Sequence, residues 1–209
     1  PEFSEPETVP LRRLFQISPL ALVGMGLQGF AASMIFGMGA VFANIIGMTN
    51  QQGSIFLASF TIANVVMQYP IGRMSDRFDR RLVILIVASI SALAAAIASI
   101  VGLSNYWTLL GLTAIFGGFS MTIYSLCIAH ANDYLSPSQM VGTASALITV
   151  NGIGAIFGPP IIATLVDLFG SYMFFAMLSA IHIGLGLFVL ARMYMREAVP
   201  AEAQGPFIA

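Results

Sequence analysis

The sequence predicts an all-α, polytopic membrane protein with six transmembrane helices and both termini in the cytoplasm. Of its 209 residues, 58% are hydrophobic and only 8% are charged, whereas an ordinary soluble domain carries roughly 25% charged residues. Too few charges remain to cover a water-soluble globule, so the composition excludes a soluble enzyme and a nucleic-acid-binding protein. The high apolar content also excludes a disordered chain. The apolar runs are continuous over about 20 residues, the length that a helix needs to cross a bilayer, and they lack the alternation typical of β-barrel strands.

Six apolar runs follow one another along the chain. We predict spans at residues 17–42, 54–71, 82–101, 108–131, 141–166 and 172–192. Polar or charged segments separate them, at residues 44–53, 72–81, 102–105, 130–139 and 167–171. The pair Ser136-Pro137 marks a helix start before the fifth span, and Pro159-Pro160 is expected to break that span. Residues 1–11 are predicted to be a polar N-terminal tail or linker end, residues 12–196 the bundle, and residues 197–209 a C-terminal cytoplasmic tail.

The basic residues predict the orientation. The chain has eight of them, and all are Arg. With six spans they all fall on one side of the membrane, at Arg12, Arg13, Arg73, Arg77, Arg80, Arg81, Arg192 and Arg196. Cytoplasmic loops carry the excess of Arg and Lys in membrane proteins, so this side is expected to be the cytoplasm. A miscounted span would have divided the arginines between the two sides.

The segment between the second and third spans carries a distinctive pattern. It runs G-R-M-S-D-R-F-D-R-R from Gly72 to Arg81. Gly72 is expected to allow a tight exit from the second helix. Asp76 lies among four cations and within reach of the positive N-terminus of a neighbouring helix. A plain positive-inside loop would explain the arginines, but neither Asp76 nor the spacing.

This pattern resembles the cytoplasmic signature loop of the major facilitator superfamily, G-x-L-[AGS]-D-[RK]-[FY]-G-R-[RK]. Asp79 stands where the family has Gly, which bears on the geometry of the turn, and Met74 stands in place of Leu. The matching positions are Gly72, Ser75, Asp76, Arg77, Phe78, Arg80 and Arg81. The resemblance covers residues 12–196 and implies the C-terminal half of a twelve-helix carrier, itself a 3+3 inverted repeat. Residues 117–137 and 142–161 resemble the YcaD-like branch of bacterial transporters.

The resemblance implies a conformational gate. In the family, the motif Asp contacts the N-terminal end of a helix in the same half, and the motif Arg pairs with an acid at the end of the fourth helix. Asp76 and Arg80 hold those positions here, and Asp133 lies at the helix end from which it could pair with Arg80. Such pairs close the cytoplasmic side and break when the carrier turns inward. The implied gating residues are Gly72, Arg73, Asp76, Arg77, Arg80, Arg81 and Asp133.

The fifth span contains closely spaced glycines and prolines. Gly154 and Gly158 are four residues apart, so they share one helix face and allow another helix to pack closely. Pro159 is expected to bend or loosen the helix. The direct role predicted for the two glycines is a packing seam, and the resemblance adds a helix that flexes during transport.

Polar side chains near the middle of four spans are candidates for the solute path, because transporter sites lie near the bilayer midplane. They are Gln28, Asn64, Tyr124 and Asn151. The alternative is that each only joins helices, at about 0.6 kcal/mol apiece. For His182, packing or an interhelix hydrogen bond is preferred to proton relay. No charged residue is predicted inside a span, so the lining suits a neutral, amphipathic or drug-like solute and supplies no coupling carboxylate.

The function implied is secondary active transport of a small solute by alternating access, as an efflux carrier or other permease of the bacterial cytoplasmic (inner) membrane. The implied partners are a small-molecule substrate, the lipid bilayer, and the missing N-terminal six-helix half or a partner chain. No cofactor, metal or nucleic acid is expected. No HExxH motif, nucleophile elbow, Walker loop or zinc-spaced set points to an enzyme. The alternative function is a non-transporting membrane scaffold or sensor subunit built on a half-carrier fold.

Overall fold

The computed structural model describes residues 10–101 and 104–195, and within these ranges it contains helices and no strands. The helices are α1 (Leu11–Ile17), α2 (Pro19–Ile45), α3 (Asn50–Arg77), α4 (Arg80–Ile100), α5 (Tyr106–Ser120), α6 (Ile123–Asn132), α7 (Pro137–Phe169) and α8 (Met173–Met195). Six helical segments in the described residues are long and apolar enough to cross a membrane, with α5 and α6 together forming one of them. The prediction of an all-α, six-span bundle is confirmed.

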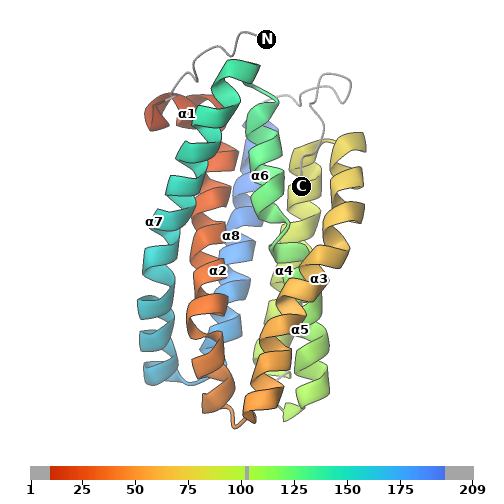
Figure 1. The fold of residues 1–209 in the computed structure, drawn as a ribbon, viewed down its shortest axis with the longest axis vertical. Coiled ribbons are helices and arrows are strands. Elements are labelled where there is room, and N and C mark those ends of the chain that lie inside the picture. Colours follow the sequence, from red (N-terminus) through yellow and green to blue (C-terminus); the bar gives the residue numbers. More distant parts are fainter. Residues whose placement is uncertain (1–9, 102–103, 196–209) are drawn as a thin grey trace.

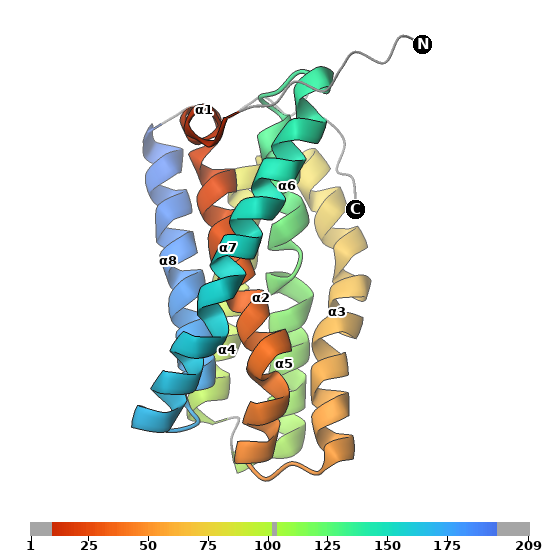
Figure 2. The same ribbon diagram turned by 60° about the vertical axis from the view of Figure 1, so that its left-hand side comes forward.

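The six spans run along the long axis of the molecule and alternate in direction (Figure 1). The start of α2, the turn between α3 and α4, the turn between α6 and α7, and the end of α8 all lie at one end. We call this the basic end, because every Arg in the described residues lies there. Helix α1 lies across it and is seen end-on in Figure 2. The placement of the basic end in the cytoplasm stays a prediction, and Arg196 lies outside the described residues.

Three helix pairs make the most extensive contacts: α2 with α7, α3 with α5, and α4 with α8. Helix α4 also packs against α5. The three pairs are the first span with the fifth, the second with the fourth, and the third with the sixth. In a 3+3 repeat, spans one, two and three correspond to spans four, five and six. The contact between spans one and five then corresponds to the contact between spans four and two, and the contact between spans three and six corresponds to itself.

Glycines let two of these pairs approach closely. A Cβ atom added at Gly158 of α7 would lie 2.6 Å from the Phe30 carbonyl oxygen of α2. One added at Gly117 of α5 would lie 2.5 Å from the Phe60 Cα atom of α3. These glycines therefore allow backbone-to-backbone packing that no other residue permits without movement of a helix.

The bundle has two apolar cores. One lies toward the basic end, where Leu14 of α1 packs with residues of α2, α4 and α6. The other lies toward the opposite end and is rich in phenylalanine. In that core the Phe42 and Phe174 rings stack with centroids 4.3 Å apart, and the Phe56 and Phe60 rings meet edge to face at 5.2 Å. Aromatic pairs at these distances add specific attraction to the burial of their surface.

The connection after the second span is shorter than predicted. Helix α3 continues through Arg77, so most of the predicted loop at residues 72–81 is helical, and only Phe78 and Asp79 separate α3 from α4. Gly72 is buried inside the helix, and the prediction of a tight helix exit there is wrong. Charged side chains do not end a helix that is leaving the apolar layer, because water and headgroups solvate them.

The fifth span is not broken at its prolines. Helix α7 continues through Pro159 and Pro160, so the predicted break is wrong. Pro159 and Pro160 lack the N–H groups that would donate to the Ala155 and Ile156 carbonyls, a loss that transmembrane helices tolerate. The interruption lies instead in the fourth span, between α5 and α6, where the Thr122 hydroxyl donates to the Phe119 carbonyl at 2.7 Å.

Candidate functional site

Asp79 holds the turn between α3 and α4. Its Oδ1 atom accepts a hydrogen bond from the Arg81 backbone N–H at 3.0 Å, which caps the N-terminus of α4. Its Oδ2 atom lies 2.8 Å from Nη2 of the Arg81 side chain. The backbone of Asp79 has a φ of −53°, which any L-residue adopts. The turn therefore does not need the glycine of the family pattern, and Asp79 adds a cap and an ion pair.

Arg80, the next residue, is buried between two other acids. Its side chain is 1% exposed, with Nε 3.4 Å from Asp133 Oδ2 and Nη2 3.7 Å from Asp76 Oδ1. The Asp133 side chain is 2% exposed, whereas that of Asp76 is 42% exposed. A buried charge requires a charged or hydrogen-bonding partner. This cluster therefore connects the start of α4 with the end of α3 and the end of α6.

The other motif residues lie around this cluster. The Arg73 guanidinium sits 5.2 Å from the centre of the Tyr69 ring, a cation–π distance. Arg77 is exposed in the last turn of α3, where a cation complements the negative end of the helix. Asp76 lies in the last turn of α3, four residues before the first residue of α4.

The four polar candidates lie on α2, α3, α6 and α7, and α2 contacts each of the other three helices. Gln28 is 3% exposed, and its Nε2 atom donates to Met121 Sδ at 3.8 Å, beside the interruption of the fourth span. Its Oε1 atom and the Asn64 Oδ1 atom are buried and have no hydrogen-bond partner among the described residues. Tyr124 is half-buried. Two of the four polar candidates thus retain an unused acceptor.

Asn151 lies in the contact between α7 and α2. Its Nδ2 atom donates to the Met25 carbonyl at 3.1 Å. Gly154 and Gly158 lie one and two turns further along α7 and face the same helix, at Gly26 and Phe30 respectively. Pro159 packs near Gly37. The structure therefore places Asn151 among groups that hold α2 and α7 together.

Gln68 is a further polar residue that joins two spans, and it was absent from the predicted set. Its Nε2 atom donates to Ser125 Oγ at 2.8 Å, which connects α3 with α6. Gln68 lies one helical turn after Asn64, so the i, i+4 spacing of two amides in an apolar helix was the available signal.

His182 makes the predicted interhelix hydrogen bond. Its Nδ1 atom lies 2.7 Å from the Leu178 carbonyl oxygen, and its Nε2 atom lies 2.8 Å from Ser120 Oγ. A carbonyl oxygen only accepts, so Nδ1 carries the proton and Nε2 accepts from the Ser120 hydroxyl. The bond fastens α8 to the last residue of α5, just before the interruption. Among the described residues, no group of three or more His, Cys, Asp or Glu could hold a metal ion.

Comparison with solved structures places this bundle among transporter folds. The crystal structure of the POT family transporter PepTSo matches 90% of this chain and 39% of its own, with a TM-score of 0.71 and 16% sequence identity. The structure of an auto-inhibited POT family peptide transporter matches 91% of this chain and 38% of its own, with a TM-score of 0.72 and 14% identity. At these identities the likeness concerns the fold: a multi-pass helical bundle that corresponds to part of a transporter.

The family follows from the sequence. The profile of the Major Facilitator Superfamily matches residues 21–209, so the chain belongs to this superfamily. The uncharacterised MFS-type transporter YcaD of Escherichia fergusonii is 24% identical over 179 residues, which cover 86% of this chain and 44% of that protein. Its counterpart in Escherichia coli K12 is 25% identical over the same shares. The predicted superfamily and its YcaD-like branch are confirmed, and the chain spans less than half the length of these relatives.

Proposed function

We propose that the chain forms a gated six-helix half of a secondary transporter that moves a small solute across the bacterial inner membrane by alternating access. Arg80, Asp133 and Asp76 form the cytoplasmic gate in this proposal. The observation that carries it is the burial of Arg80, whose ion pairs connect three helix ends. Separation of these ends requires the pairs to break, so the cluster stabilises one arrangement of the helices over another.

Polar side chains of α2 and α3 line the solute path in this proposal. Gln28 and Asn64 each hold a buried acceptor oxygen without a partner among the described residues. Leaving such an atom unpaired costs about 1–3 kcal/mol, and a solute that donates a hydrogen bond would recover part of it. Asn151 is proposed to keep α7 against α2 instead, because its amide already binds the Met25 carbonyl.

A comparison of transport by the unmodified protein and by the Asp76→Asn variant tests the gate. The Asp76 carboxylate is 42% exposed, and exposed ion pairs contribute at most about 1 kcal/mol. Asp76→Asn should therefore insert and fold normally while transport is lost. The measurement is uptake and efflux of radiolabelled amines, sugars, amino acids and organic acids by inner-membrane vesicles, with membrane content checked by immunoblot. Full transport of any solute by well-folded Asp76→Asn protein would remove the gating role.

A thiol-reactivity measurement tests the gate without knowledge of the solute. Ser75 is fully buried near the end of α3, and its Oγ atom has no hydrogen-bond partner among the described residues. Ser75→Cys in a Cys127→Ala background therefore adds a thiol and breaks no bond. Asp133→Asn should raise the rate of its reaction with methyl methanethiosulfonate at least several-fold, because the gate opens more often. Asn132→Ala, one residue earlier, is the control and should leave the rate unchanged.

The two measurements distinguish a transporter from a scaffold. A non-transporting scaffold or sensor subunit with one fixed arrangement predicts no solute movement and an Asp133→Asn rate equal to that of the control. Equal rates would therefore contradict alternating access in this half.

A further inference from the structure

An open pocket lies at the opposite end of the bundle, away from the gate. It has a volume of about 400 Å³ and lies between α2, α7 and α8. Its lining consists of Met38, Val41, Phe42, Ile45, Ile162, Ala163, Val166, Asp167 and Phe174. The side chains of Phe42, Ile162 and Phe174 are almost fully buried and form its floor, whereas Val41 and Ile45 are 46% and 53% exposed at its rim. The volume falls in the range of small-molecule sites.

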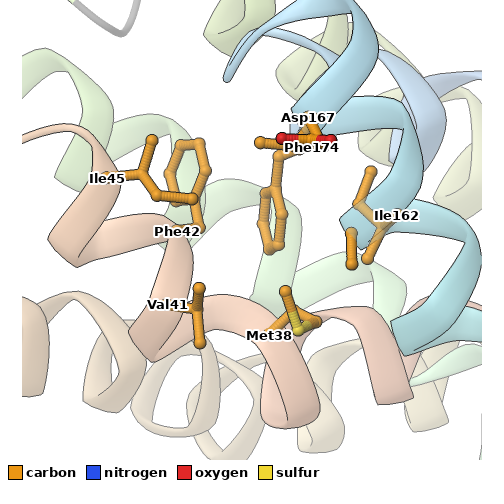
Figure 3. Close-up of a pocket in the computed structure, with 9 residues that line it drawn as sticks. Met38, Val41, Phe42, Ile45, Ile162, Asp167 and Phe174 are labelled. Atoms are coloured by element: carbon orange, nitrogen blue, oxygen red, sulfur yellow. The ribbon is translucent and has the colours of Figure 1, made fainter.

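Asp167 is the only polar side chain in this lining. Figure 3 shows its carboxylate at one end of the pocket beside Phe174. In residues 10–101 and 104–195, every other charged side chain lies at the basic end. No ion pair or side-chain hydrogen bond joins Asp167 to another described residue. The Asp167 side chain is exposed, and among the described residues no cation lies beside its carboxylate.

Two helix ends increase the negative potential of the pocket. Asp167 lies in the last turn of α7, and Phe42 and Ile45 lie in the last turn of α2. Neither last turn contains a basic residue, although a helix C-terminus carries partial negative charge and favours a cation. The N-terminus of α8 adjoins the pocket, but its Met173 and Phe174 N–H groups already donate to Gly170 and Ser171 carbonyls.

We propose that this pocket binds a lipophilic organic cation, whose charged nitrogen meets Asp167 and whose apolar body covers the phenylalanine floor. The lining offers no side-chain donor, because an ionised carboxylate only accepts. An anion would be repelled, and a sugar would leave its acceptors unpaired. A cation with an apolar body can pair with the Asp167 carboxylate and also cover the apolar lining of the pocket. This binding does not depend on transport and involves none of the gate residues.

Titration with a matched pair of ligands tests the proposal. The probes are benzyltrimethylammonium and neopentylbenzene, its neutral isostere in which carbon replaces nitrogen. Binding to the purified 209-residue chain in detergent is followed by calorimetry or ligand-observed NMR. We expect saturable binding of the cation and at least tenfold weaker binding of the isostere, a difference of about 1.4 kcal/mol.

Variants of Asp167 locate the site. Asp167→Asn should weaken cation binding at least tenfold, and Asp167→Glu should retain most of it. Asp167→Asn/Asn50→Asp is the matched control, since it returns a carboxylate to the same end of the molecule outside the pocket, at the N-terminus of α3 where an acid is tolerated. This control should not restore binding. Thermal unfolding of each variant verifies that it is folded.

Three results would overturn the proposal. The first is equal affinity for the cation and its isostere, which would mean simple apolar partitioning. The second is unchanged binding by folded Asp167→Asn protein, or restored binding by the Asn50→Asp control, which would mean a general surface attraction. The third is the absence of saturable binding to the unmodified chain up to about 10 mM ligand, the limit of a weak site.

Discussion

Arg80 and Arg81 are neighbours in the sequence, but different acids hold their side chains. Arg81 lies against Asp79, which precedes α4, whereas Arg80 points into the bundle toward Asp133. Successive residues of a helix project about 100° apart, so the first turn of α4 directs one guanidinium to the turn and the other to the interior. The two arginines therefore have separate roles: one fixes the start of a helix, and the other joins helices.

Replacement of Asp79 should separate its two contributions. Asp79→Ala removes the cap and the ion pair and should lower the free energy of unfolding by about 1–2 kcal/mol. Asp79→Asn keeps a capping oxygen, and Asp79→Gly retains most of the capping preference, so each should cost less than Asp79→Ala. The measurement is unfolding by SDS in mixed micelles, followed by circular dichroism. Equal losses for Asp79→Asn and Asp79→Ala would show that the cap contributes nothing.

At the scale of elements, glycines allow the close approach of two helix pairs, α2 with α7 and α3 with α5. In α7, Gly158 faces the α2 backbone, whereas a Cβ atom added at Gly152 meets no other atom within 4 Å. The same contrast exists in α5 between Gly117, which faces Phe60, and Gly111, which is open. Helices α5 and α7 thus each contain one glycine that packing requires and one glycine that it does not require.

The packed and the open glycine of each helix allow a prediction with a matched control. Gly158→Ala and Gly117→Ala should destabilise the bundle by about 1–3 kcal/mol, because the added methyl group forces the helices apart. Gly152→Ala and Gly111→Ala should have no effect or stabilise slightly, since alanine favours helix over glycine. Thermal midpoints of the four purified variants provide the measurement. A loss at Gly152 equal to the loss at Gly158 would indicate that helix propensity, rather than the seam, is responsible.

The sequence predicted helical spans better than it predicted their ends. Apolar length located all six spans, because the bilayer imposes that length directly. It did not predict that α3 continues through Arg77, since helices emerging into water no longer need apolar residues. Nor did it locate the interruption at Thr122, because the partners there come from distant helices, including Gln28 of α2 and, through Ser120, His182 of α8.

Part of the candidate site could also be predicted from the sequence. The resemblance to the family implied that Arg80 pairs with Asp133, and the structure gives the geometry of that pair. Asp167 was assigned to a turn, and its place in α7 beside an apolar pocket emerged only from the packing of three helices. Asp79 was noted only as a departure from the family pattern, because a capping role depends on where the helix begins.

For the whole molecule, the separation of charge predicts its orientation in the membrane. Gln16 of α1 and Gln51 of α3 are both exposed and lie at the basic and opposite ends respectively. In a Cys127→Ala background, Gln51→Cys should react with a membrane-impermeant maleimide in intact spheroplasts. Gln16→Cys should react only after permeabilisation, because basic ends face the cytoplasm. The reverse pattern would place the gate on the outside.

The pairing of α2 with α7 also has a consequence for synthesis of the chain. The hydrogen bond from Asn151 to Met25 joins residues 126 positions apart. At about 5–20 residues per second, the ribosome needs roughly 6–25 s to make the intervening chain. During that time the face of α2 that will pack against α7 lacks its partner and is exposed to lipid or to other nascent helices. Variants that slow translation between α2 and α7 should therefore increase misassembly and proteolysis without altering the finished protein.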